Sequence, residues 1–140
     1  MSSLRHTTKT TMSKAHVYPA PPVGPEDTPF FDAAREGRFL IKRCKDCGQY
    51  HWYPRPVCPH CFSSATEWVP SAGQGVVYSH STMQRLDPPF TLAYVTLAEG
   101  PTMMTHLVDG GGQPWQIGQA VKVVFKASED GTPVPCFAPA

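Results

Sequence analysis

The chain has 140 residues, of which 41% are hydrophobic and 16% are charged, so it can bury one small core. Its 16 prolines and 11 glycines argue against a helix-rich fold, because both residues disfavour helix interiors. The formal net charge of +1 lacks the basic excess of a dedicated nucleic-acid binder, and no apolar run reaches the roughly 18 residues of a membrane span.

The first 27 residues are polar and then proline-rich, without periodicity, and we expect them to form a flexible arm. Residues 1–17 contain many Ser and Thr and no acidic residue, which leaves two alternatives open: a disordered start or an organelle-targeting segment. Five cysteines, four of them in two tight pairs, fit a reducing compartment better than a secreted protein. We therefore expect a cytoplasmic location.

Residues 28–37 carry the signals of a short helix. Thr28 can cap it, Pro29 suits the first helical position, and Gly37 can end it in a left-handed conformation. A helix of about eight residues is too short to be stable alone, so Phe30 and Phe31 must pack on this domain or on a partner. We expect a docking helix here.

Two C-x-x-C motifs lie within residues 38–70, flanked by short strands expected at 38–43, 49–53 and 66–69. This pattern predicts a rubredoxin-like zinc ribbon. Four thiolates form a closed tetrahedral shell around zinc, which is the structural and not the catalytic arrangement. Iron, an iron–sulfur cluster and disulfides are the alternatives, and iron is the serious one because its ligand geometry is similar. The four ligands are Cys44, Cys47, Cys58 and Cys61.

From residue 71 onward the pattern changes to strands separated by turn-forming sequences. Five strands within about 70 residues favour a small barrel, and the five-stranded OB-fold is the natural candidate over residues 71–140. The whole chain is thus predicted to be mainly β, with a short N-terminal helix, a zinc ribbon and an OB-fold barrel. The expected strands are 75–83, 91–97, 103–108, 120–125 and a final piece near 134–137.

The sequence offers little catalytic chemistry. Cys136 is the one unpaired cysteine, and no neighbouring residue supplies the base that a nucleophilic thiol needs. His80 and His106 lie on expected strands, where each side chain has equal chance of facing solvent or a pocket, and His51 and His60 lie in the ribbon. No paired carboxylates, phosphate-binding glycine loop or serine nucleophile motif is present. The chain is predicted to be a binding or assembly unit.

The order of these parts resembles a family of small zinc-ribbon/OB-fold proteins that was first catalogued as a domain of unknown function. The resemblance covers residues 28–140. It implies a non-catalytic subunit, because family members associate with thiolase-like enzymes, ketosynthase relatives or hotdog-fold enoyl-CoA hydratases. The matching stretches are 30–40, 43–61, 75–79, 88–90, 93–100 and 117–125.

The resemblance further implies that the partner processes acyl-CoA thioesters, as in the breakdown of steroid side chains and aromatic compounds or in ketone-forming and mevalonate pathways. The small subunit is expected to stabilise its partner and to help hold coenzyme A. Many family members have a longer helical lead-in than the proline-rich arm here, and many have lost the cysteines that this chain keeps.

Specific residues can be assigned to that role, each with an alternative. Arg43 and Arg55 are candidates for the phosphates of coenzyme A, although basic side chains around a ribbon also serve to offset the charge of the metal site. The candidate docking aromatics alternatively fill the seam between ribbon and barrel. Nucleic-acid binding by the ribbon and OB-fold, and a freestanding thioesterase-like or lyase activity, are the rival functions. The docking candidates are Phe30, Phe31, Trp52 and Phe90.

Overall fold

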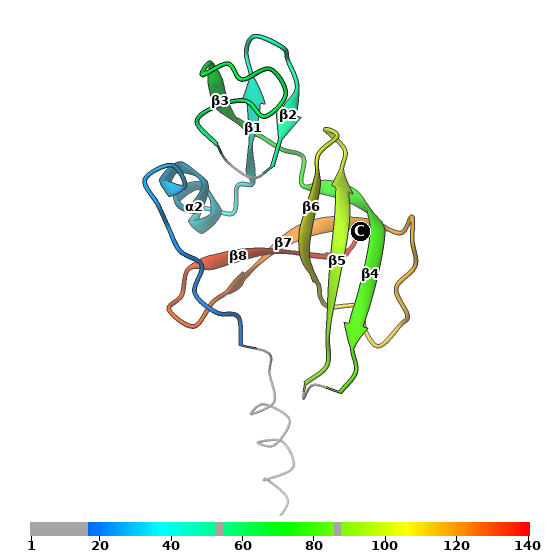
Figure 1. Cartoon of the computed structure of the whole chain (residues 1–140). Helices are drawn as coiled ribbons and strands as arrows, with labels where there is room; N and C mark the ends of the chain where they lie inside the picture. Colours follow the sequence, from blue (N-terminus) through cyan, green and yellow to red (C-terminus); the bar gives the residue numbers. More distant parts are fainter. Residues whose placement is uncertain (1–16, 53–54, 86–87) are drawn as a thin grey trace, which may run out of the picture.

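The computed structural model describes residues 17–52, 55–85 and 88–140, and it has one short helix, a three-stranded sheet and a closed five-stranded barrel (Figure 1). This mainly β architecture confirms the predicted fold class. No helix within the described ranges has the length and apolarity needed to cross a membrane. The elements are α2 (Thr28–Arg35), β1 (Leu40–Cys44), β2 (Tyr50–His51), β3 (Thr66–Pro70), β4 (Gln74–Met83), β5 (Phe90–Leu97), β6 (Thr102–Leu107), β7 (Ala120–Ala127) and β8 (Pro133–Pro139).

The barrel has the strand order β4-β5-β6-β8-β7, in which β6 and β8 are parallel and every other pair is antiparallel. This is the five-stranded OB-fold arrangement. Strand β5 shows how the sequence turns one face toward the barrel interior. Ala93, Val95 and Leu97 are buried, while Tyr94 between them is exposed. All five expected strands are present, and each observed strand overlaps its expected range.

Helix α2 begins at Thr28, the residue predicted to cap it, so its N-cap lies one residue earlier than predicted. Asp27 is the N-cap residue, and its carboxylate accepts a hydrogen bond from Gly24 N–H at 3.2 Å and makes no capping bond. Thr28 is therefore the first helical residue and not the cap. Gly37 ends the helix as expected, with φ of 81° and a bond from its N–H to the carbonyl of Ala34 at 2.9 Å.

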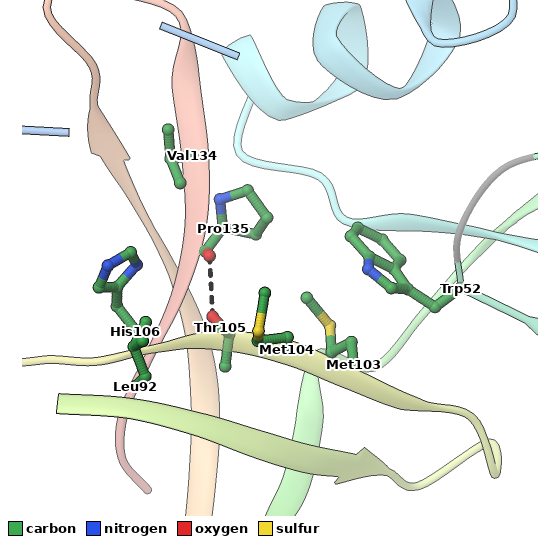
Figure 2. Close-up of a pocket in the computed structure, with 8 residues that line it drawn as sticks. All are labelled: Trp52, Leu92, Met103, Met104, Thr105, His106, Val134 and Pro135. Atoms are coloured by element: carbon green, nitrogen blue, oxygen red, sulfur yellow. Dashed lines mark hydrogen bonds between the residues drawn. The ribbon is translucent and has the colours of Figure 1, made fainter. Parts of the chain in front are cut away.

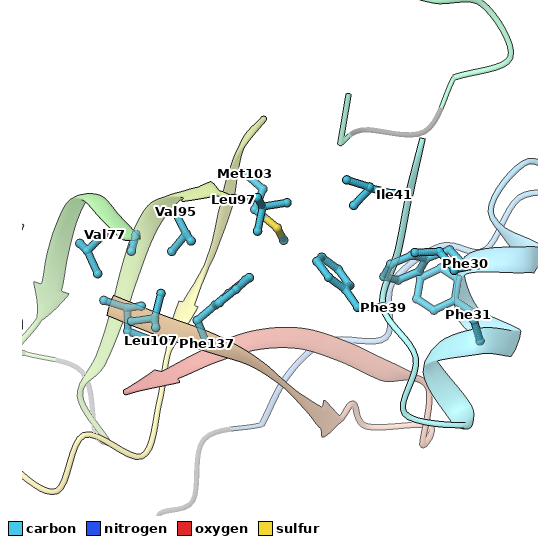
Figure 3. Close-up of a cluster of buried hydrophobic side chains, with 14 residues drawn as sticks. Phe30, Phe31, Phe39, Ile41, Val77, Val95, Leu97, Met103, Leu107 and Phe137 are labelled. Atoms are coloured by element: carbon cyan, nitrogen blue, oxygen red, sulfur yellow. The ribbon is translucent and has the colours of Figure 1, made fainter. Parts of the chain in front are cut away.

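One hydrophobic core joins helix, ribbon and barrel (Figure 3). Within the barrel Phe137, Val95 and Val121 are 0% exposed, and at its ribbon-facing end Phe39 packs against Phe125 and Phe137 at ring distances of 6.2 and 6.3 Å. Ile41 of β1, also 0% exposed, extends the core into the ribbon. The ribbon is thus fixed to the barrel by apolar packing, which aromatic residues dominate.

The proline-rich arm differs from the expectation of flexibility in its described part, residues 17–27. The carbonyl of Tyr18 accepts a hydrogen bond from Glu129 N–H at 2.9 Å, and the Glu129 carboxylate accepts one from Ala20 N–H at 3.0 Å. The Tyr18 ring also meets His106 edge-on at 5.1 Å. Prolines reduce the number of conformations that the unbound arm can adopt, so the arm loses less conformational entropy when it packs on the barrel. A few contacts are therefore enough to order it. The alternatives for residues 1–16 lie outside the described residues.

Candidate metal centre and docking surface

The four predicted ligands converge at the end of the ribbon that lies farthest from the barrel. Their sulfur atoms all lie within 4.8 Å of one another. Sulfurs from opposite C-x-x-C motifs approach most closely, with Cys44 Sγ 3.6 Å from Cys61 Sγ and Cys47 Sγ 3.7 Å from Cys58 Sγ. Tetrahedral zinc with Zn–S bonds of about 2.3 Å requires sulfurs about 3.8 Å apart. The donor set therefore fits a closed, four-coordinate structural zinc site.

The two motifs form matching knuckles. Gly48 N–H donates to the carbonyl of Cys44, and Phe62 N–H donates to the carbonyl of Cys58, both at 2.9 Å. The residue after each second cysteine adopts the left-handed conformation, with φ of 76° at Gly48 and 63° at Phe62. Glycine adopts this conformation without strain, whereas phenylalanine does not. The first knuckle is thus the less strained of the two.

Backbone N–H groups donate hydrogen bonds to sulfur atoms of the site. A hydrogen bond from the backbone of Cys47 is the main cause that lowers the pKa of Cys44 to about 7. The N–H of His60 likewise donates to Cys58 Sγ at 3.3 Å. Because zinc binds thiolate and not thiol, hydrogen bonds to sulfur favour the ligating form.

Arg43 and Arg55 have different neighbours in the ribbon. Arg43 Nη1 lies 3.4 Å from the Glu67 carboxylate, and its guanidinium lies over the ring of Tyr50. Arg55 lies near His51, which pairs with Lys42 across the strands. Because Lys42 and Arg43 are neighbours in one strand, their side chains point to opposite faces. A contact of either arginine with coenzyme A is a proposal.

The four docking candidates have different surroundings. Phe30 and Phe31 are 5% and 8% exposed and pack against each other within this chain at 5.0 Å, so the structure places them in the seam and not on the surface. Trp52 is half-buried, with its ring 5.2 Å from Phe30. Phe90 is half-buried at the start of β5, 5.6 Å from His106. Trp52 and Phe90 are therefore the accessible members of the set.

An apolar hollow of about 300 Å³, here called the seam groove, opens between the ribbon and the barrel (Figure 2). In Figure 2, Trp52 stands on one side and His106 on the other, with Met103 and Met104 between them. The hydroxyl of Thr105 donates to the carbonyl of Pro135 at 3.0 Å and so fixes β6 to β8 at its floor. The groove is lined by Trp52, Leu92, Met103, Met104, Thr105, His106, Val134 and Pro135.

Two smaller hollows continue the seam groove along the surface. One shares Leu92 and Met104 with it and extends over β4, and the other shares Trp52 and Pro135 with it and reaches α2. The strands β5 and β6, which form the usual ligand face of an OB-fold, contain no charged residue. Phosphate backbones are bound chiefly by Lys and Arg, so this face suits an apolar ligand or a protein and not a nucleic acid.

Sequence reasoning missed most of the seam groove, because Trp52, Leu92, Met104 and Val134 are far apart in the chain. One local signal was available. Strand β5 is apolar on both faces, since Leu92 and Tyr94 alternate with the buried Ala93 and Val95. A strand at a solvated surface usually alternates apolar with polar residues, so an apolar outer face indicates a contact surface.

The remaining candidates for catalysis have surroundings that differ from one to the next. Cys136 is buried, and desolvation raises the pKa of its thiol to about 11 despite a hydrogen bond from Tyr18 that lowers it. A thiol held in its neutral form is a poor nucleophile. His51 is also buried, and desolvation lowers its pKa. His80 lies exposed on β4, and His106 lines the seam groove.

Comparison with known proteins agrees with this architecture. Residues 31–67 match the family model described as "ChsH2, rubredoxin-like zinc ribbon domain", and residues 68–126 match "ChsH2, C-terminal OB-fold domain". A DUF35 domain-containing scaffold protein of Methanocaldococcus jannaschii is 31% identical over 64% of this chain and 69% of its own length. The chain belongs to the DUF35 family. This confirms the family resemblance found in the sequence.

Other relatives of this DUF35 chain are known by name or structure. A probable enoyl-CoA hydratase alpha subunit of Thermomonospora curvata is 30% identical over 97% of the chain, which spans only 44% of that relative. The solved structure of an "Ltp2-ChsH2(DUF35) aldolase" contains a chain 30% identical to this one, with a TM-score of 0.73 over 86% of this chain and 98% of that chain. A Sulfolobus solfataricus DUF35 protein, 16% identical with a TM-score of 0.63 over the full length of both chains, shows the shared fold.

Proposed function

We propose that this chain is a non-catalytic accessory subunit that binds and stabilises an acyl-CoA-processing enzyme, either a thiolase-like aldolase or thiolase or an enoyl-CoA hydratase. The observation that carries the proposal is the seam groove, an apolar surface beside Trp52 and Met104 in a chain whose unpaired thiol is buried and protonated. The names of the relatives support the partner class, since they include a hydratase subunit, scaffold proteins and an aldolase complex.

In this proposal the partner supplies the nucleophile and the base, and this chain supplies a rigid surface. The metal centre holds the ribbon in shape, and the aromatic seam holds the ribbon against the barrel. Trp52 from the ribbon and Met104 from the barrel then present one continuous face. Burial of each large apolar side chain by a partner is worth about 1.5–3 kcal/mol, so a few such residues provide most of the binding energy.

The proposal also includes zinc as the resident metal and the cytoplasm as the location. Four thiolates remain available for metal only where the thiols stay reduced. Elemental analysis of the protein purified from its native source tests zinc against iron, and a stoichiometric iron content would replace zinc in the proposal.

A matched pair of charge substitutions tests the docking surface. Met104, 52% exposed, lines the seam groove, whereas Ile117, 73% exposed, lies in the loop between β6 and β7 outside the groove. We expect Met104→Glu to abolish co-purification of the thiolase-like or hydratase partner from native extract, and Ile117→Glu to leave it intact. Retention of the partner by the Met104→Glu protein, or recovery of nucleic acid that dissociates steeply with salt, would contradict the proposal.

The coenzyme A part has its own test. In the reconstituted complex, Arg43→Ala and Arg55→Ala should each weaken binding of coenzyme A about tenfold if that side chain meets a phosphate. Arg38 is the control, because it is an exposed arginine that already pairs with Glu36 at 2.7 Å. Equal binding by all three variants would remove these arginines from the proposal and leave the docking function in place.

A further inference from the structure

A further hollow, of about 450 Å³, lies at the end of the barrel opposite the ribbon, and no part of the proposed function uses it. It opens between the end of the β4–β5 hairpin, which extends beyond the rest of the barrel, and the loop that joins β6 to β7 (Figure 1). We call it the hairpin pocket. Its lining is His80, Thr82, Gln84, Thr91, Leu107, Val108, Asp109, Gly110, Gly112, Gln113, Pro114 and Trp115.

The inward-facing positions of the hairpin change from apolar to polar at this pocket. Within the barrel Val77 pairs with Val95, and both are buried in the core. Four pairs farther along, beyond a register shift between Val77 and Ser79, Thr82 lies opposite Thr91, and their hydroxyls are 2.8 Å apart. Residues directly opposite each other share a face of the sheet, and Thr91 also pairs with Leu107, a core residue. The polar groups on this inward face are tolerated because the two hydroxyls satisfy each other by a hydrogen bond and Thr82 and Thr91 both line the opening.

The other wall carries an aromatic ring held against the backbone. A side-chain carbon on Gly110 would lie 2.8 Å from Cζ2 of Trp115, so glycine is what allows the indole to lie this close to the loop. Among the described residues of the lining Asp109 contributes the only carboxylate, and Lys126 pairs with it at 3.0 Å. The described part of the lining therefore offers polar groups, and its one carboxylate is paired with a lysine.

We propose that the hairpin pocket binds a purine-type base. Stacking of a base on an aromatic side chain is worth about 1–3 kcal/mol, and Trp115 offers such a surface. The amides of Gln84 and Gln113 each present a donor and an acceptor, the pairing by which glutamine recognises adenine. No Lys or Arg is among the described residues of the lining, so the site recognises the neutral base and leaves any attached phosphate in solvent. The volume falls within the range of small-molecule sites.

The test uses the full-length, metal-loaded protein and adenosine as the probe, and it does not depend on the partner. The chain has three tryptophans, and Trp115→Phe assigns their indole N–H signals in a nitrogen-15 correlation spectrum. We expect adenosine to shift the Trp115 signal saturably and to leave those of Trp52 and Trp68 in place. Gln84→Ala and Gln113→Ala should each weaken binding about three- to tenfold. Gln116→Ala, an exposed glutamine outside the pocket, is the control and should not change it.

Further ligands distinguish the source of the base. A Trp115 shift with coenzyme A at lower concentration than with adenosine identifies an adenine-bearing cofactor, and a shift with adenosine and AMP alone identifies a free nucleotide. Three results would overturn the inference. They are no shift of the Trp115 signal at the solubility limit of adenosine, an equal shift with a simple sugar, and binding of oligodeoxyadenylate alone with a steep salt dependence. None of these results bears on the seam groove, so failure here leaves the proposed function untouched.

Discussion

The ribbon and the barrel are stabilised by different interactions. The barrel buries side chains from all five of its strands, among them Val77, Val95, Met103, Val121 and Phe137. In the outer ribbon, over residues 45–52 and 55–67, the structure buries only His51 and Cys58. An apolar core cannot hold such a segment, so its order depends on the metal. One short chain therefore combines a barrel stabilised by burial of apolar side chains with a ribbon stabilised by coordination of a metal ion.

Metal removal should give the largest difference between the ribbon and the barrel. Structural zinc in small ribbons contributes on the order of 10–16 kcal/mol, more than the outer ribbon can replace by packing. We expect chelation under reducing conditions, or Cys58→Ser, to remove hydrogen-exchange protection from residues 44–67 while the barrel, residues 74–139, keeps its protection. Hydrogen exchange with mass spectrometry reads both regions in one experiment. Loss of protection in both regions together would show that the two are one cooperative unit.

The seam is where the two kinds of stabilisation meet, and Phe39 tests it. Its ring is 4% exposed and lies 5.3 Å from Trp52 and 6.2 Å from Phe125, on the ribbon and barrel sides respectively. Phe39→Ala should lower the free energy of unfolding by about 3–5 kcal/mol, because it leaves a cavity between two packed units.

The matched control for that substitution is Phe62→Ala. Phe62 is 80% exposed at the second knuckle and should cost little when truncated. Chemical denaturation of both metal-loaded proteins measures the difference. Similar stability of the two variants would mean that the seam contributes little and that ribbon and barrel are held together only by the chain connection.

The ribbon and the barrel could be predicted because the features that stabilise them, metal ligands and alternating buried residues, are visible in the sequence. The cysteine spacing specifies the ribbon directly, since only the pairs at Cys44 and Cys58 bring four sulfurs to one ion. Alternation specifies the barrel strands, since burial of every second residue in β5 requires it. Both signals are local, and local signals survive without any knowledge of the tertiary structure.

Features that depend on distant residues could not be predicted in this way. Neither Phe30 nor Tyr18 shows in the sequence what it packs against, so a docking helix and a flexible arm were reasonable expectations. In the structure Phe30 is buried beside Trp52, and Tyr18 lies against His106, 88 positions away in the chain. Composition indicates how stiff a segment is and how apolar a side chain is. It does not indicate against which surface of the fold the segment or the side chain packs.

A pair of pH-sensitive groups lies where the N-terminal arm packs on the barrel: Cys136 of β8 and Tyr18 of the arm. Burial raises the pKa of Cys136 from 9.0 to about 11, and burial together with the nearby Cys136 raises the pKa of Tyr18. Below pH 9 the Cys136 thiol is neutral in both the folded and the unfolded chain, so its contribution to stability is complete. Between pH 9 and 11 only the unfolded thiol ionises, and stability falls by roughly 2–3 kcal/mol.

The measurement is the free energy of unfolding at pH 8 and pH 11 with metal bound. Cys136→Ala should remove most of the fall between these values, although it lowers stability at both. Tyr18→Phe should remove the smaller part that arises above the ordinary tyrosine pKa of 10.0. An unchanged fall in both variants would assign the alkaline sensitivity to other groups.

The smallest expected effects compare the two knuckles with each other. Gly48 and Phe62 occupy equivalent positions with φ of 76° and 63°, and the position of a Cβ on Gly48 is free of close contacts, with Arg43 Nη2 nearest at 3.6 Å. Gly48→Ala should therefore cost only the left-handed backbone penalty, about 1–2 kcal/mol.

Phe62→Gly should relieve a similar penalty at the second knuckle. The greater conformational entropy of the unfolded glycine offsets part of the gain, so the substitution should stabilise the second knuckle by less than about 1 kcal/mol. Zinc affinity measured by competition with a chromophoric chelator should change in the same two directions, because each knuckle must fold for its sulfurs to bind. If both substitutions weaken zinc binding equally, the Phe62 ring contributes contacts that outweigh its backbone strain, and the two knuckles are equivalent in energy despite their different residues.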